Sequence, residues 1–238
     1  MDDFDNIVRK FAYDSDMDDI LKDFYIPALA ISKKYFRLTG FFSSNSIGIA
    51  SKGIRNLIKN GGTMKLITGI QLSLEDKESI EKNVGTYEKS ISKNILKELE
   101  SFSEKDFSLQ HAKLLGWMLR NNLLEMKIAV VSGPGIFHQK VGILQDTTGK
   151  EISFSGSNNE TAGGWVNDIE EFKVFKSWVE GQSEYFQHDE LKFNQYWYNK
   201  AERCSVYELP DAIREHLIEI SPKNYEDLDL GYDDGIEG

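Results

Sequence analysis

Residues Ile136–Phe172 read IFHQKVGILQDTTGKEISFSGSNNETAGGWVNDIEEF and contain two short apolar runs separated by a polar turn. In a β-strand, side chains two positions apart share a face, so the first run predicts a strand on which His138 and Lys140 point together. A turn through Thr147-Thr148-Gly149 then brings a second strand, Ile152–Ser155, alongside the first. The sequence therefore predicts a β-hairpin that presents an imidazole and an ammonium on one face.

A second group of polar residues follows the second predicted strand. Gly156 allows the backbone to approach closely, and Ser157 and Asn159 come directly after it. With His138 and Lys140 they supply an imidazole, an ammonium, a hydroxyl and a carboxamide that face a common point. A phosphodiester needs a cation and neutral donors on its non-bridging oxygens and a nucleophile in line with the leaving oxygen. An imidazole can be that nucleophile, so these residues are candidates for phosphodiester chemistry.

A carboxylate near the imidazole would hold the ring in the required tautomer. The candidates are Glu170 and Glu171, a carboxylate pair that begins eleven residues after Asn159. An isolated H-x-K on an exposed strand is common by chance and needs no functional explanation. The combination of H-x-K with G-S-x-N and a later carboxylate favours a catalytic site.

These motifs resemble those of the phospholipase D superfamily, whose signature is H-x-K, four residues, D, then G-S-x-N. The matching positions here are His138, Lys140, Gly156, Ser157 and Asn159. The resemblance implies an α/β fold with a mixed β-sheet flanked by helices on both faces. It also implies that His138 attacks phosphorus to form a phosphohistidine, while Lys140, Ser157 and Asn159 hold the phosphate.

The chain departs from this signature at the aspartate. Gln145 stands at the expected place, and Asp146 comes one position later. Nuclease branches of the superfamily often use a downstream glutamate instead, in an N-x-E pattern that Asn167–Phe172 resembles. We therefore favour Glu170 as the residue that orients the imidazole, with Glu171 and Asp146 as alternates.

The resemblance continues outside the motif, towards one nuclease branch. In that branch, a domain of this kind lies at the N-terminus of bacterial superfamily 2 helicases and restriction-like proteins. The segments that carry the resemblance are YFRLTGFFSS (Tyr35–Ser44), LIKNGGTMKLITG (Leu57–Gly69), SNNETAGGW (Ser157–Trp165), FKVFKSW (Phe172–Trp178) and VYELPDAIREHL (Val206–Leu217). We expect a phospholipase D-like nuclease domain over residues 1–218 and an acidic flexible tail or linker over residues 219–238.

Phospholipase D enzymes generally use two H-x-K motifs, whereas this chain has one convincing copy. A second copy, His111-Ala112-Lys113, lies in a helical pattern, in which alternate side chains do not share a face. Small single-motif nucleases of the superfamily complete the site by forming a two-fold dimer. We therefore expect a homodimer in which one His138 is the nucleophile and the partner's copy is the general acid and base.

Composition limits the possible classes of protein. The chain has 238 residues, with 40% hydrophobic and 28% charged, which is ordinary for a globular protein with a real core. No apolar run approaches a membrane span, and the acidic N-terminus lacks the features of a signal peptide. The single cysteine, Cys204, excludes an internal disulfide and a cysteine zinc cluster. We expect a cytoplasmic protein without a membrane partner, a cofactor or a catalytic metal.

The net charge of −11 argues against simple nonspecific binding to nucleic acid, which relies on basic surface. Much of it is local, because residues 219–238 contain seven acidic residues and one lysine. A basic cleft is compatible with an acidic overall balance.

The remaining elements alternate between strands and helices. Tyr35–Thr39, a helix over Ile47–Ile58 closed by Asn60-Gly61-Gly62, and Met64–Thr68 suggest a parallel βαβ unit. The further expected elements are a helix from Ser73 to Phe102 capped by Ser73, a helix over Leu109–Leu124 with Leu115, Met118 and Leu119 on one stripe, a strand at Lys127–Val131, a strand at Phe172–Ser177, and a helix over Ser183–Tyr198 whose aromatic residues face the core.

The function that these observations predict is a metal-independent phosphodiesterase acting on DNA. The resemblance suggests the endonuclease domain of a helicase-linked restriction or phage-defence protein, with a C-terminal helicase region as a further partner. One alternative is a non-catalytic module that binds DNA or mediates dimerisation. Another is a phospholipid-processing enzyme, which the absence of a basic amphipathic helix disfavours.

Overall fold

The structure is a computed structural model of the chain, and it describes residues 3–40, 51–70, 72–82, 87–100, 107–157 and 170–228. The start of the helix expected over Ile47–Ile58 lies outside these residues, as does Asn159.

An eight-stranded mixed sheet forms the centre of the described part of the chain, in the order β1-β7-β6-β5-β2-β3-β4-β8. The neighbours β2, β3 and β4 run parallel, and the other pairs are antiparallel. The strands are β1 (Ala12–Asp14), β2 (Ser32–Thr39), β3 (Thr63–Gly69), β4 (Leu124–Val131), β5 (Val141–Asp146), β6 (Glu151–Gly156), β7 (Glu171–Lys176) and β8 (Cys204–Glu208).

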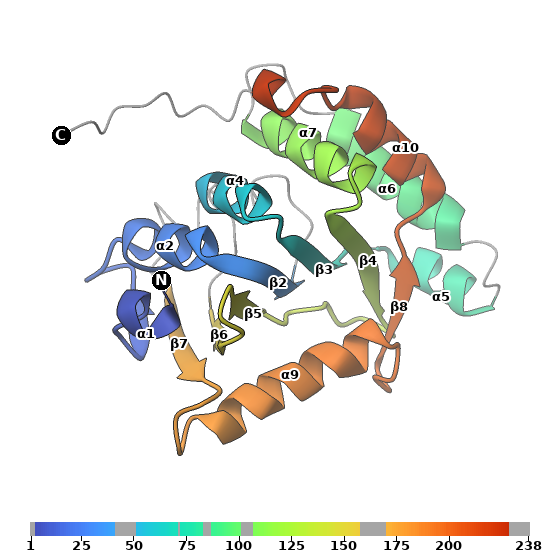
Figure 1. Ribbon diagram of the computed structural model, residues 1–238. Helices are drawn as coiled ribbons and strands as arrows, with labels where there is room; N and C mark the ends of the chain where they lie inside the picture. The colour runs from blue at the N-terminus through green and yellow to red at the C-terminus, as the bar shows by residue number, and fades with distance from the viewer. Residues whose placement is uncertain are drawn as a thin grey trace.

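Helices cover both faces of this sheet (Figure 1). The long helix α9 crosses one face, and α2, α4, α7 and α10 lie on the other. The predicted α/β fold, a mixed sheet with helices on both faces, is therefore confirmed. The helices are α1 (Phe4–Ile7), a π-helix (Leu21–Tyr25), α2 (Ile26–Ala30), α4 (Ser51–Lys59), α5 (Leu74–Lys82), α6 (Tyr87–Glu100), α7 (Phe107–Arg120), α9 (Ser183–Trp197), α10 (Asp211–Ile220) and a 3₁₀ turn (Tyr225–Asp227).

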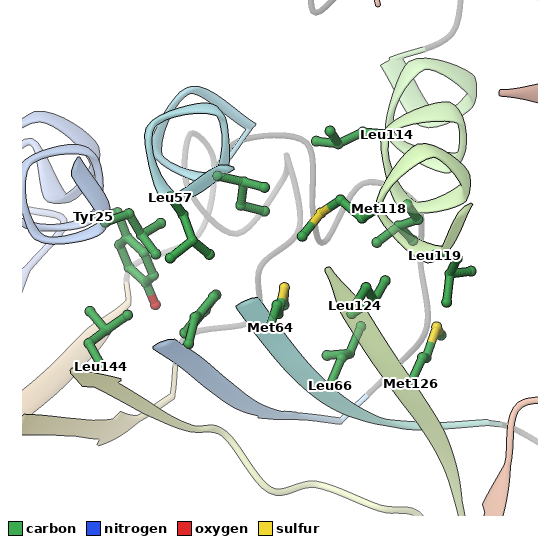
Figure 2. Close-up of a cluster of buried hydrophobic side chains, with 14 of the residues drawn as sticks. Tyr25, Leu57, Met64, Leu66, Leu114, Met118, Leu119, Leu124, Met126 and Leu144 are labelled. Carbon is green, nitrogen blue, oxygen red and sulfur yellow. The ribbon is translucent and has the colours of Figure 1, made fainter. Parts of the chain in front are cut away.

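The larger hydrophobic core lies between the sheet and the helices α2, α4 and α7, as Figure 2 shows. The predicted stripe on α7 is part of it, since Leu115, Met118 and Leu119 are all buried. Met64 and Leu66 of β3 meet this helix layer from the sheet side. Each fully buried side chain of this size stabilises the fold by about 1.5–3 kcal/mol. The predicted βαβ unit is confirmed by the parallel pairing of β2 with β3.

The smaller core lies beneath α9, where Phe186, Phe193 and Trp197 cover apolar residues of β2, β3 and β5. The expectation that all aromatic residues of this helix face the core is wrong for Tyr185, which is 60% exposed. Its ring stacks on Phe175 of β7, with 4.9 Å between the ring centroids. A helix lying on a sheet buries only one stripe, so an aromatic residue beside the stripe stays at the margin.

Two predicted helix boundaries are confirmed in atomic detail. The hydroxyl of Ser73 accepts a hydrogen bond from the amide of Asp76 (3.0 Å) and donates to the Asp76 carboxylate (2.8 Å), which caps α5. After α4, Gly61 has a φ of +66°, and the amides of Gly61 and Gly62 donate to the carbonyls of Ile58 and Leu57. A left-handed residue of this kind ends a helix at low cost only as glycine or asparagine.

Other boundaries differ from prediction. The helix expected from Ser73 to Phe102 is two described helices, α5 and α6. The helix expected to reach Leu124 ends at Arg120, and Leu124 begins β4. Strand β1, strand β8 and helix α10 were not predicted as elements.

The C-terminal boundary also differs from prediction. Helix α10 runs past residue 218 to Ile220, and Leu228 is buried in the larger core. The guanidinium of Arg120 donates to the carbonyls of Ile218, Ser221 and Pro222. The described part of the expected tail therefore packs against the domain, while residues 229–238 lie outside the described residues.

Candidate active site

The segment that leads into His138 crosses the carboxyl ends of the parallel strands β2 and β3. Gly40 follows β2, and Gly69 ends β3. A Cβ atom on Gly69 would lie 2.5 Å from the carbonyl oxygen of Gly40 and 2.8 Å from Cβ of Phe137. A Cβ atom on Gly40 would lie 3.0 Å from the carbonyl oxygen of Phe137 and 3.4 Å from Cα of His138. These two glycines therefore set how closely the backbone of His138 approaches the sheet.

The substitution Gly69→Ala tests this close contact. The added methyl group has to push away backbone atoms next to Phe137, and a displacement of about 1 Å at a catalytic group can reduce turnover by about 10²-fold. We expect the rate of phosphodiester cleavage, the activity predicted from the sequence, to fall at least tenfold. Gly53→Ala is the control, since its Cβ would meet only the side chain of Leu29 (Cδ1 at 2.6 Å), between α4 and α2. Equal rates for the two variants would contradict this role for Gly69.

A buried lysine fixes the loop immediately before His138. Lys77 of α5 is 7% exposed, and its ammonium donates to the carbonyl oxygens of Gly133 and Gly135 at 2.7 Å each. Two charge-assisted bonds to one short loop hold its backbone in place. The chain then reaches His138 three residues after the second anchored carbonyl.

The substitution Lys77→Met is expected to lower the cleavage rate about tenfold, because the loop loses both anchors and His138 is held less firmly. Steady-state cleavage with circular dichroism as a check on folding measures this effect. Lys82→Met is the control, since Lys82 lies on the same helix but forms an exposed pair with Glu78 (3.4 Å). A loss of the same size in both variants would mean that Lys77 has no particular connection to the site.

His138 and Lys140 lie next to each other in space, although the strand predicted to carry them begins only at Val141. Nζ of Lys140 is 2.8 Å from Nε2 of His138. This is a hydrogen-bonding distance: a charged Lys140 donates to Nε2 in the ring tautomer that carries its proton on Nδ1. The imidazole is exposed, whereas Lys140 is 5% exposed. The predicted pairing of these side chains therefore holds, but they precede the strand.

The environment of Lys140 disfavours its charged form. Burial lowers the pKa of the ammonium below its ordinary value, the carboxylate of Glu170 opposes this by raising the pKa, and the guanidinium of Arg37 lowers the pKa further. Glu170 and Arg37 thus both lie near enough to Lys140 to act on its charge. Glu170 favours the charged form and Arg37 disfavours it.

The two candidate glutamates have different environments in the structure. Glu170 is 7% exposed, and its Oε2 atom has no hydrogen-bond partner among the described residues. Glu171 is exposed and forms an ion pair with Lys173 on the surface. Consecutive residues of a strand point to opposite faces, so only one of the pair faces Lys140. The carboxylate that acts on the charge of Lys140 is that of Glu170.

Gly156 and Ser157 lie where β6 meets β7. A Cβ atom on Gly156 would lie 2.1 Å from the carbonyl oxygen of Glu171, which only glycine avoids. The Ser157 hydroxyl is exposed and accepts a hydrogen bond from the amide of Glu171 at 3.0 Å. In the sheet register Val141 faces Ser155, so Gly156 is level with Lys140. The hydroxyl of Ser157, which follows β6, therefore lies at the same end of the paired strands β5 and β6 as Lys140.

Asp146, the other alternate, lies at the opposite end of β5 from Lys140. Its carboxylate accepts hydrogen bonds from the amides of Thr148 (2.8 Å), Lys150 (3.0 Å) and Phe4 (3.1 Å). These bonds close the hairpin turn and attach α1 to it. The structure therefore does not bring Asp146 to His138, and this alternate is not retained.

Two residues near the site were not identified from the sequence. Arg37 of β2 is fully buried (0% exposed) and stands opposite Gly142 in the sheet, with its guanidinium carbon 5.3 Å from the ring centroid of Phe154. An arginine within the apolar run YFRLT was the available signal, because charged residues are rarely fully buried. Ser15 contacts Glu170, and no sequence signal indicated it.

Three further properties concern the described residues. They contain no group of three or more histidine, cysteine, aspartate or glutamate side chains arranged to hold a metal ion. No helix among them is long and apolar enough to cross a membrane. Cys204 is buried, and this burial raises the pKa of its thiol to about 11, so the thiol stays protonated and unreactive near neutral pH.

Several solved structures are similar to this one. NucT from Helicobacter pylori matches with 14% identity and a TM-score of 0.44, covering 82% of this chain and 96% of that one. Nuc from Salmonella typhimurium, described as a phospholipase D family member, matches with 14% identity and a TM-score of 0.40, covering 73% and 87%. Phosphatidylserine synthase from Haemophilus influenzae matches with 13% identity and a TM-score of 0.46, covering 87% and 44%. No protein-family model matches the chain, and no curated protein matches it either.

Proposed function

We propose that this chain is a metal-independent phosphodiesterase of the phospholipase D superfamily that cleaves DNA through a phosphohistidine intermediate. The observation that carries the proposal is the contact between His138 Nε2 and the buried Lys140 Nζ at 2.8 Å, with the buried carboxylate of Glu170 acting on the same ammonium. In this proposal His138 is the nucleophile, Lys140 is the phosphate-binding cation and Glu170 is the orienting carboxylate.

In the proposed first step, a phosphodiester binds with its non-bridging oxygens on Lys140 and Ser157. The phosphate oxygens compete for the ammonium that otherwise donates to Nε2 of His138, which frees the lone pair of that nitrogen. A bond then forms between Nε2 and phosphorus while the bond from phosphorus to the leaving oxygen breaks. Asn159, which lies outside the described residues, is proposed as a further phosphate ligand.

The leaving oxygen needs a proton from a group on the far side of phosphorus, because displacement is in line. Lys140 is on the nucleophile's side, so it is poorly placed for this role. We propose that a second His138, from another copy of the chain, donates this proton. The same residue then takes a proton from water, which attacks phosphorus and breaks the N–P bond. An exposed imidazole, as His138 is, can be reached by a second subunit.

A subunit-mixing experiment tests the shared site. If each site needs two copies of His138, only dimers with two intact chains are active. An equal mixture of the unmutated chain and His138→Ala is unfolded and refolded, so that dimers form at random. It should have about one quarter of the activity of a sample with the same total protein concentration that contains only the unmutated chain. A value of about one half would show that each chain acts alone and would contradict the shared site.

Cleavage in excess EDTA tests the function itself. The substrates are supercoiled plasmid, single-stranded and double-stranded DNA, RNA, and vesicles of phosphatidylcholine with anionic lipid. We expect DNA cleavage that persists in EDTA. Cleavage that requires a divalent ion would overturn the mechanism, and release of a lipid headgroup without DNA cleavage would favour the phospholipid-processing alternative. DNA binding without cleavage would favour a non-catalytic module.

The wider setting is also a proposal. The resemblance of the segments around β2, β3 and β7 to helicase-linked nuclease domains suggests a restriction or phage-defence protein with a helicase region as partner. Co-expression with such a helicase and a plaque assay on bacteria carrying the pair would test this setting. Unchanged phage yield would count against it.

A further inference from the structure

The N-terminal segment reaches across the chain to the carboxylate of the candidate site. Strand β1 pairs with β7 in antiparallel register, so that Asp14 faces Glu171. The amide of Ser15 donates to the carbonyl oxygen of Glu170 at 2.9 Å, which continues the ladder by one residue. In addition, the Ser15 hydroxyl accepts a hydrogen bond from the amide of Glu170 at 2.8 Å. Both backbone polar groups of Glu170 are therefore bonded to this one serine.

We propose that Ser15 is a positioning residue of the active site, acting through Glu170. The proposal rests on the function proposed above, in which the Glu170 carboxylate orients the catalytic pair. The two bonds from Ser15 fix the backbone of Glu170, and the direction of its side chain follows from that backbone. The Glu170 side chain is itself buried, and its Oε2 atom has no hydrogen-bond partner among the described residues. Its position is thus set through the main chain rather than by bonds to both carboxylate oxygens.

The neighbouring contacts show why a serine suits this position. Before this position Tyr13 stacks on Phe172 of β7 with 5.3 Å between ring centroids, and after it Asp18 pairs with Lys10 of the same N-terminal segment. The residues around Ser15 are mostly acidic, in the run Asp14-Ser15-Asp16-Met17-Asp18-Asp19. An aspartate at position 15 would bring a second negative charge against Glu170, and an alanine would leave the Glu170 amide without its acceptor. A hydroxyl accepts the bond without adding charge.

The simpler reading of Ser15 is that it ends an edge strand and has no influence on catalysis. The hydrogen bond from the amide of residue 15 to the carbonyl of Glu170 would suffice to end the strand, and it does not depend on the serine side chain. The hydroxyl bond distinguishes the two readings, because it is lost in Ser15→Ala and kept in Ser15→Thr, while the backbone bond remains in both. Ser177→Ala is a matched control at the other end of β7, where the amide of Ser177 donates to the carbonyl of Glu151 at 3.0 Å.

The experiment compares DNA cleavage by the unmutated chain, Ser15→Ala, Ser15→Thr and Ser177→Ala, and repeats Ser15→Ala in a Glu170→Gln background. We expect a loss of about tenfold in kcat for Ser15→Ala with little change in KM, recovery in Ser15→Thr, and no loss in Ser177→Ala. Because Ser15 acts through Glu170, its removal should cause no further loss once that carboxylate is gone. Hydrogen exchange of the Glu170 amide, measured by NMR, should be faster in Ser15→Ala than in the unmutated chain.

The outcomes separate this inference from the proposed function. If the unmutated chain does not cleave DNA, the proposed function fails and the inference fails with it. If the unmutated chain cleaves and Ser15→Ala cleaves equally well, the function stands and the inference is overturned. A full tenfold loss on top of Glu170→Gln would also overturn it, since Ser15 would then act independently of Glu170. Faster amide exchange without a change in kcat would leave Ser15 a purely structural residue.

Discussion

The substitution His138→Ala is expected to reduce DNA cleavage by about 10⁴-fold or more, to the background of the assay. The reason is that no other group in the described site offers a nucleophile: Lys140 is a buried cation and the Ser157 hydroxyl is bonded to the backbone of Glu171. The exposed position of His138 means that its removal should cost little stability. Loss of activity with an unchanged thermal midpoint is the expected result.

The control is His188→Ala, because His188 is an exposed histidine on α9, across the sheet from the site. A covalent intermediate gives a second measurement. Quenching with detergent at alkaline pH during turnover should trap a phosphoramidate-linked label, stable to base and released by acid, on the unmutated chain and none on His138→Ala. DNA cleavage by His138→Ala, or a covalent label on that variant, would contradict the proposed mechanism.

The substitution Glu170→Gln is expected to lower cleavage by roughly 10²–10⁴-fold, as the loss of an orienting carboxylate does in other histidine-centred sites. Glu171→Gln is its matched control, and we expect almost no effect there, because Glu171 is exposed and paired with Lys173. Equal losses in the two variants, or a larger loss in Glu171→Gln, would contradict the assignment of Glu170.

The same variant should also change the pH dependence of cleavage. Burial lowers the pKa of Lys140, and Glu170 counteracts this by raising it. In the proposed mechanism Lys140 binds phosphate as a cation, so activity should fall as pH rises through its pKa. Removing the charge of Glu170 lowers this pKa further, and the alkaline limb of the profile should move to lower pH. Cleavage rates across pH, with ¹³C NMR of the lysine side chains to follow Lys140 directly, measure this shift.

Arg37→Met should shift the alkaline limb in the opposite direction. The guanidinium lowers the pKa of Lys140 as a like charge, so its removal raises that pKa, and the limb should move to higher pH. Arg37→Lys keeps the charge and should shift the limb less. Shifts of the same sign in Glu170→Gln and Arg37→Met would show that these two residues do not control the charge of Lys140.

The elements with strong local signals could be predicted from the sequence. The hairpin of β5 and β6 follows from two apolar runs around Thr147-Thr148-Gly149, and the unit β2–α4–β3 follows from helical spacing and a closing Gly61. The pairing of His138 with Lys140 was also predictable, since alternate residues of an extended chain share a face. These features depend on neighbours within a few residues, which the sequence displays directly.

The features that were missed depend on partners far away in the sequence. Strand β1 has three residues, and only Tyr13 among them is fully buried, so it has no usable periodicity. The role of Lys77 requires α5 to lie against the loop at Gly133–Gly135, 56 to 58 residues later. Glu170 was favoured over Glu171 only through the resemblance to an N-x-E pattern, because adjacent identical residues offer no local means of deciding which face each side chain occupies.

The pairing of β1 with β7 also constrains the order in which the molecule folds. Ser15 contacts Glu170 across 155 residues, and Phe4 contacts Asp146 across 142. During synthesis β1 leaves the ribosome before β7 and has to wait, unpaired, until β7 has been made. Contacts of such high sequence separation form late, because a long loop has to be closed before they are gained. The carboxylate proposed for the site would thus be secured in one of the last steps of folding, and we expect a nascent or truncated chain to stay inactive until then.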